Sequence, residues 1–194
     1  MQLIRVGRIA IASAVAICFV ATAAAASVPG NWNPPPGFWS TPTIAGYGRI
    51  HYESRFAYQP QPDQFYKIVV ALTAGAKHPS QVDPALDHLA RIVNLYVAAG
   101  VPLTHLKFVG IAYGAATPAM MDNAHYRARF GVDNPNLKLI GELRKAGVVV
   151  TVCAQAVAEH HINYAWVSKE VPISLSALTT VTVLEHDGYT LMQE

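Results

Sequence analysis

The feature that most constrains the fold is a regular alternation of short apolar runs with helix-start signals, which begins after Phe65. Residues 66–72 read Tyr-Lys-Ile-Val-Val-Ala-Leu, the nearly continuous apolar pattern of a strand buried on both faces. Asp83-Pro84 then predicts the start of a helix, because Asp caps free N–H groups and Pro fits the first helical position. Apolar residues follow at helical spacing up to Gly100, which predicts the end of the helix.

The same alternation continues to the end of the chain. We expect further strands at 106–113, 148–153, 171–175 and 189–192. We expect further helices at 119–129, 136–146, 154–161 and 176–187, the first two begun by the pairs Thr117-Pro118 and Asn134-Pro135. This order predicts an α/β domain, in which right-handed crossovers place helices on both faces of a parallel sheet. Binding and active sites of such sheets lie beyond the carboxyl ends of the strands. Here these ends lead into the loops 73–82 and 114–117 and the turn at Cys153.

Residues 27–64 have a different composition from the rest of the chain. They hold 7 of the 13 prolines, and such Pro- and Gly-punctuated sequence does not sustain helices. They also carry many aromatic residues, which give them too much apolar surface for a solvated linker. We therefore expect an extended arm that lies on the domain or on a neighbouring subunit, with a flexible tether as the alternative.

The first 26 residues have the pattern of a secretory signal. Arg5 and Arg8 form a positive n-region, residues 9–20 are apolar, and Ala24–Ala26 supply the small residues of a cleavage site. The apolar stretch is short for a membrane span, so we expect cleavage after Ala26 and a periplasmic protein with no membrane attachment afterwards. An uncleaved N-terminal anchor is the alternative.

The charge of the chain excludes one class of partner. The 14 basic residues include Arg5 and Arg8, and the remaining 12 equal the 12 acidic residues in number. A balanced chain has no basic surface of the kind that binds nucleic acid or an anionic membrane. We therefore expect no nucleic-acid partner.

Cysteine counting singles out Cys153. Cys18 lies in the signal, so the mature chain keeps one thiol and forms no internal disulfide. Cys153 follows a strand and directly precedes a predicted helix, where the helix dipole and unpaired N–H groups favour thiolate. One thiol cannot run a dithiol cycle, which leaves a monothiol carrier, a nucleophile or one metal ligand. The alternative is a small apolar residue packed at a strand end.

Other chemistry finds little support in the sequence. His160 and His161 lie about two helical turns from Cys153, too far to activate it within one subunit. The loop 113–118 lacks the Gly pattern and Lys of a phosphate cradle. We expect no metal and no cofactor, although histidines of a neighbouring subunit could join Cys153 at a metal site.

From Tyr66 onward the chain resembles the DsrE/DsrF-like family, which includes the TusD-type sulfur-relay subunits. The resemblance covers about two thirds of the sequence. It rests on a set of short segments in a fixed order: 66–70, 95–102, 114–118, 130–137, 152–155 and 175–178, with 43–48 similar to the lead-in of exported members.

The resemblance implies a five-stranded parallel sheet in a flavodoxin-like three-layer sandwich, assembled as a homotrimer or homohexamer. In the relay proteins, the cysteine that ends the third strand accepts sulfane sulfur as a persulfide and passes it to a partner protein, and Cys153 occupies that position. The sequence thus favours periplasmic sulfur trafficking with a donor or acceptor protein; a non-catalytic oligomeric scaffold is the alternative. The pocket residues expected around Cys153 are Tyr113, Gly114, Thr117, Gln155, Thr73 and Asn134.

Overall fold

The centre of the fold is a sheet of five parallel strands, seen in a computed structural model that describes residues 32–194. The strands are β1 (Tyr66–Leu72), β2 (Leu106–Ala112), β3 (Val149–Cys153), β4 (Ile173–Ser174) and β5 (Thr190–Gln193). Their order across the sheet is β4-β3-β2-β1-β5, and every pairing is parallel. The α/β class and the all-parallel sheet predicted from the sequence are confirmed. The predicted signal, residues 1–26, lies outside the described residues.

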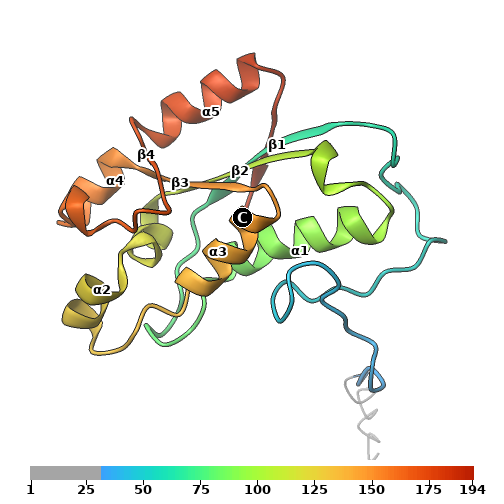
Figure 1. Ribbon diagram of the computed structural model, residues 1–194, viewed down its shortest axis with the longest axis horizontal. Helices are drawn as coiled ribbons and strands as arrows, with labels where there is room; N and C mark the ends of the chain where they lie inside the picture. The colour runs from blue at the N-terminus through green and yellow to red at the C-terminus, as the bar shows by residue number, and fades with distance from the viewer. Residues whose placement is uncertain (1–31) are drawn as a thin grey trace, which may run out of the picture. The chain divides into compact units, whose positions relative to one another are not determined.

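Helices cover both faces of the sheet, which gives the predicted three layers (Figure 1). On one face, α1 (Pro84–Ala98) contacts β1 and β2, and α3 (Leu137–Lys145) contacts β3. On the other face, α5 (Ala177–His186) contacts β1 and β2. Two shorter helices, α2 (Asn123–Phe130) and α4 (Ala154–Glu159), lie between β2 and β4 in the chain. The remaining turns are the 3-10 helices η1 (Leu103–His105), η2 (Gly114–Met120) and η3 (Tyr164–Trp166).

The two faces of the sheet carry separate cores. Successive side chains of a strand point to opposite faces, so alternate residues of β1 enter different clusters. Ile68, Val70 and Leu72 join the larger cluster with α1 and α3, whereas Val69 joins a smaller cluster on the α5 face. Each such aliphatic side chain stabilises the fold by about 1.5–3 kcal/mol on full burial, so the α1 face holds most of the stability.

Two helix starts differ from the prediction. Thr117-Pro118 does not begin a helix; both residues lie inside η2. The next helix, α2, begins at Asn123 and is capped by Asp122, whose carboxylate accepts from His125 N at 2.8 Å. Asn136, with no side-chain cap, occupies the N-cap of α3 instead of Asn134. The residues before α2 form a tighter 3-10 turn because η2 folds back against α4 and β3, which a local capping signal cannot reveal.

The arm packs on α1, so the flexible-tether alternative is wrong for its described part. Residues 35–194 form one compact unit. Asn94 of α1 is completely buried; its Oδ1 accepts from Thr43 N and Ile44 N, and its Nδ2 donates to Tyr47 O and Gly48 O. One side chain thus satisfies four backbone groups of the arm that have no strand or helix partner.

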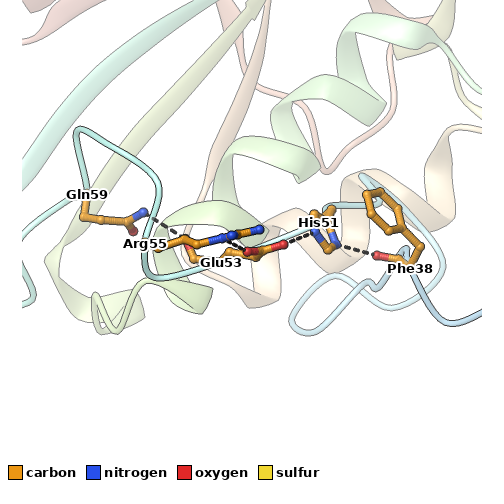
Figure 2. Close-up of polar contacts among 5 residues, drawn as sticks. All are labelled: Phe38, His51, Glu53, Arg55 and Gln59. Atoms are coloured by element: carbon orange, nitrogen blue, oxygen red, sulfur yellow. Dashed lines mark hydrogen bonds and ion pairs between the residues drawn. The ribbon is translucent and has the colours of Figure 1, made fainter. Parts of the chain in front are cut away.

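A second set of polar contacts holds the arm to itself (Figure 2). The His51 ring stacks on Phe38 and donates from Nδ1 to Phe38 O at 3.0 Å. Its Nε2 lies 2.9 Å from Glu53 Oε1, and Arg55 donates to the other Glu53 oxygen. These hydrogen bonds, first from Arg55 and then from His51, hold the pKa of Glu53 below its ordinary value.

Candidate functional site

Cys153 ends β3 and is the N-cap residue of α4, where the sequence placed it. Its Sγ accepts a hydrogen bond from Ala156 N at 3.5 Å, so an unpaired helix N–H group points at the sulfur. The residue is 5% exposed. It is the one free cysteine in the described part of the chain.

The surroundings of Cys153 are apolar. It shares the smaller core cluster on the α5 face with Val69, Ile111, Ala156 and Ala177, and Tyr113 packs against this cluster. Ala177 is the first residue of α5 and its one buried residue, so the start of α5 covers the cluster. Of the expected pocket residues, Tyr113 is thus brought to the same cluster as the thiol.

The loops after β1 and β2 meet at the carboxyl edge of the sheet. A Cβ on Gly75 would stand 2.6 Å from Ala115 O, so only glycine permits this approach. Thr73 does not point to the thiol: its Oγ1 donates to Glu194 O at 2.9 Å and closes the end of β5 against β1. Gly114 lies at the surface with φ +55°, which allows the sharp turn from β2 into η2.

Two further predicted residues flank α4. Gln155 is exposed and donates from Nε2 to Leu175 O at 3.0 Å, which ties α4 to the segment that leads into α5. Thr117 is buried in η2, which packs against α4, and its Oγ1 has no hydrogen-bond partner among residues 32–194.

Asn134 has a structural part instead of a place beside Cys153. Its Nδ2 donates to Ala119 O at 2.9 Å and to Met121 O at 2.7 Å, and its Oδ1 accepts from Asn136 N and Nδ2. It therefore ties the end of η2 to the start of α3, away from the thiol cluster.

The two histidines after α4 stay apart from the thiol within one subunit. His160 is the C-cap of α4 and His161 follows with φ +54°, so both lie at the opposite end of the helix from Cys153. Within residues 32–194, no three His, Cys, Asp or Glu side chains are grouped to hold a metal ion.

A separate pocket, which the sequence did not predict, opens at the carboxyl ends of β1 and β2. It has a volume of about 230 Å³, and we call it the Asp83 pocket. Its lining comes from the loop after β1, from η2, from α2 and from the N-cap of α3: Ala76, Lys77, Pro79, Asp83, Ala115, Pro118, Ala119, Tyr126, Phe130 and Asn136. Cys153 does not line the Asp83 pocket.

Asp83 carries the buried charge of this pocket. It is 1% exposed, and burial raises the pKa of its carboxyl group to about 6, against the opposing hydrogen bonds from Leu86 N and Ala85 N. Asn136 Oδ1 accepts from Asp83 N at 2.7 Å, which links the pocket to the Asn134 contacts. The sequence marked Asp83 only as a helix cap; the pair Asn134 and Asn136 just before a helix was the available sign of a buried polar network.

Comparisons with known proteins leave the family open. No protein-family model matches the sequence, and no curated protein matches it significantly. The solved structure of MTH1491 from Methanobacterium thermoautotrophicum, titled a protein of unknown function, aligns with a TM-score of 0.49 and 12% sequence identity. The alignment covers 66% of this chain and 99% of that one. In residues 32–194, no helix combines the length and apolar character that crossing a bilayer requires.

Proposed function

We propose that the protein carries sulfane sulfur as a persulfide on Cys153. The observation that carries the proposal is the position of this thiol: it caps α4 at the carboxyl end of the third strand of a parallel sheet, with Ala156 N donating to the sulfur. The carboxyl edge is where α/β sheets place their reactive groups. The resemblance to the DsrE/DsrF-like family supports the proposal, because in the relay proteins of that family the sulfur-accepting cysteine also ends the third strand.

The chemistry needs only one thiol and no oxidant. The Cys153 thiolate attacks the outer sulfur of a small persulfide, R–S–S–H; a Cys153 Sγ–S bond forms while the donor S–S bond breaks, and the donor leaves as R–S⁻. Attack by an acceptor thiolate on the outer sulfur reverses these steps and returns Cys153 as thiolate. Tyr113, packed beside the cluster, shields the bound sulfur from water.

Access to the thiol follows from the weak attachment of α5. Ala177 covers the cluster, yet it is the one buried residue of that ten-residue helix. Val181 and Leu184 also pack on the cluster but are only half-buried, so α5 opens locally at a lower free-energy cost than a fully buried helix would. Opening of the first turn of α5 exposes Cys153 to a donor without disturbing the α1 face.

Mass spectrometry of the folded protein tests the proposal. After incubation with a small alkyl persulfide, the wild-type protein is expected to gain the mass of one sulfur atom, and the reductant dithiothreitol is expected to remove it. The variant Cys153→Ser is expected to gain nothing. A wild-type protein that remains unmodified under conditions that load a free cysteine peptide contradicts the proposal.

A second candidate function is a non-catalytic oligomeric scaffold in which Cys153 is only packed. The apolar lining of the thiol favours it, as does an exposed apolar surface over β3, β4 and α5. Leu175 and Val183 line a groove of about 530 Å³ there, and Leu178 is exposed on the same helix as Val183. The two candidates differ in thiol reactivity: iodoacetamide alkylates a carrier thiol in the folded protein, but reaches a packed thiol only after unfolding.

The proposed setting is the periplasm, where the protein assembles with itself. Residues 1–26 support export, and the exposed surface over α5 supports self-association; the size, a homotrimer or homohexamer, is what the family resemblance implies. The mass of the protein recovered from cells that express the full chain tests export directly. Removal of residues 1–26 is the expected result, and an intact N-terminus contradicts it.

A further inference from the structure

A groove between the arm and the α/β domain is lined mainly by aromatic rings. Its volume of about 560 Å³ lies in the range of ligand-binding pockets. One wall is the arm segment 51–60, and the other comes from the start of β1 and the last turn of α1. We call it the arm groove, and its lining is His51, Tyr52, Phe56, Ala57, Tyr58, Gln59, Pro60, Tyr66, Leu95 and Tyr96.

The arm wall of this groove is held by its own hydrogen bonds. Gln59 Nε2 donates to Glu53 O at 3.2 Å and to Phe56 O at 2.9 Å, which closes the loop that carries the exposed rings (Figure 2). Tyr58 lines the groove although it is fully exposed, and it has φ +58°. The left-handed region is uncommon for an aromatic residue, and backbone strain of this kind clusters at ligand-binding positions.

The aromatic surface continues beyond the arm groove. Tyr66 and Tyr96 meet edge to face, with 4.7 Å between ring centroids, and both also line a second cavity of about 450 Å³. Phe65, which is exposed, lines that second cavity. Two cavities joined by shared rings form a track of aromatic faces, and such a track fits an extended peptide better than a compact molecule.

The polar groups along the groove are uncharged hydrogen-bond donors. Among residues 32–194, no Lys, Arg, Asp or Glu lines the arm groove. The hydroxyls of Tyr52, Tyr58 and Tyr96 make no hydrogen bond to other residues in that range. A proline segment in the polyproline II conformation offers apolar rings to the aromatic faces and carbonyl oxygens to these hydroxyls. Its prolines have no N–H group that binding could leave unpaired.

This chain carries such a segment in its own arm. Asn33, Pro34 and Pro35 each precede a proline, which restricts all three to extended or polyproline II backbone. Pro35 and Pro36 are exposed, and neither lines the arm groove of its own chain. The segment ends in a turn, where Phe38 N donates to Pro35 O at 3.1 Å. Because the segment is already restricted, it loses little conformational entropy on binding.

We propose that, in the self-assembled protein, the arm groove of each chain binds residues 33–36 of a second copy. The inference rests on the proposed self-assembly through α5, because a contact with three prolines is weak until assembly raises the local concentration of the segment. It does not depend on the chemistry proposed for Cys153.

Peptide binding tests the groove itself. The acceptor is the full chain with Pro34→Ser, Pro35→Ser and Pro36→Ser, so that no copy supplies the segment. A fluorescent peptide with the sequence of residues 31–38 is expected to bind it saturably in an anisotropy titration, one peptide per chain. The same peptide with serine in place of its three prolines is expected not to bind. The proposal is overturned if the proline peptide does not bind, or if the serine peptide binds as tightly.

Matched variants of that acceptor test the site of binding. Phe56→Ser combined with Tyr58→Gly removes two exposed rings, and glycine accepts the left-handed backbone at position 58. This pair is expected to weaken peptide binding by about tenfold, the effect of losing aromatic anchors. Leu103→Ser changes an exposed apolar residue that lines neither cavity and is expected to leave binding unchanged. Equal binding by the two variants overturns the proposed site.

Photo-crosslinking tests whether the segment comes from a second copy. In the otherwise wild-type chain, Tyr58→benzoylphenylalanine places a photoreactive ring at the groove. Illumination is expected to give a product of twice the chain mass, in which position 58 is joined to the tryptic peptide that ends at Arg49 and contains residues 33–36. A crosslink within one chain, a crosslink to another protein, or no crosslink to this peptide overturns the inference.

Light scattering of the wild-type protein separates this failure from a failure of self-assembly. An oligomer that gives no crosslink between copies leaves the assembly through α5 standing and overturns only the exchange of the arm segment. A monomer contradicts both.

Discussion

Asp83 shows how a residue with an ordinary local role can have an unusual tertiary environment. Asp83-Pro84 begins α1 as the sequence predicts, because capping depends on neighbours two and three residues away. Its burial depends on η2, α2 and the start of α3, which come from more than 30 residues later in the chain. The sequence therefore predicts the cap but not the buried charge.

The raised pKa makes Asp83 a source of pH-dependent instability. The folded state holds the proton with a pKa of about 6, whereas the ordinary value is 3.8. Stability from this group is therefore full below about pH 4 and is lost as the pH rises through 6. At pH 7.5 the ionised carboxylate costs about 2–3 kcal/mol relative to pH 4.

Asp83→Asn is thus expected to stabilise the protein at pH 7.5 by about 1–2 kcal/mol, because Asn keeps the cap without the charge. Urea unfolding at pH 7.5 and at pH 4 measures the effect. At pH 4, where Asp83 is already largely protonated in the folded state, the two proteins should differ much less. An equal difference at both pH values contradicts this account.

At the scale of elements, the arm and α1 form one structural unit that depends on a close backbone approach. Gly48 lies against α1 with φ +56°, and a Cβ there would stand 2.2 Å from Arg91 N. Its N–H donates to Asp87 Oδ1 at 2.8 Å, so the arm cannot move away without losing that bond as well as those to Asn94. The sequence gives the aromatic content of the arm, but not the Asn94 contacts that hold it.

Gly48→Ala is expected to release the arm. The clash with helix backbone adds to the left-handed strain, for a cost of about 2–5 kcal/mol in docking free energy. The Thr43 and Ile44 amides donate to Asn94 Oδ1, so faster hydrogen exchange at these two amides reports the release of the arm.

Gly46→Ala is the matched control. Gly46 has φ +83°, but no atom lies within 4 Å of a Cβ placed there. Its substitution is expected to cost about 1–2 kcal/mol through backbone strain alone, with the two amides still protected. Equal exchange in both variants contradicts the role given to the Gly48 contact.

The helix-start signals show where sequence reasoning about elements succeeds. Asp83-Pro84 correctly predicts the start of a helix, because α1 packs on β1 and β2 of the sheet. Thr117-Pro118 carries the same signal but lies in η2, where contacts with α4 and β3 favour a 3-10 turn over an α-helix. The true cap, Asp122, comes four residues beyond Pro118, and tertiary contacts alone separate the two cases.

At the scale of the whole molecule, the α5 face is the least completed layer. Leu178 is 81% exposed and Val183 is 59% exposed on a helix with one buried residue. Val183 lines one groove with the exposed Leu175, and exposed apolar surface of this kind marks an interaction surface. The repeating β–α order of the sequence predicted the three layers. It did not predict that α5 would leave apolar side chains such as Leu178 and Val183 exposed to solvent.

The proposed self-assembly is expected to fail when this surface is charged. Leu178→Glu combined with Val183→Glu should convert the oligomer to monomer, because burying two carboxylates without partners is strongly unfavourable. Light scattering after size exclusion measures the mass. Lys138→Glu, an exposed charge change on α3, should leave it unchanged. A wild-type protein that is already monomeric contradicts the assembly.

The central claim is that Cys153 carries sulfur, and the tryptic peptide 146–169 tests it most directly, because this peptide contains Cys153 and no other cysteine. After the folded protein is loaded with a small alkyl persulfide and alkylated, tandem mass spectrometry of this peptide should place one additional sulfur atom on Cys153. Brief exposure to an acceptor thiol before alkylation should remove that sulfur. A peptide that carries only the alkyl group, in protein that stayed folded throughout loading, would contradict the claim.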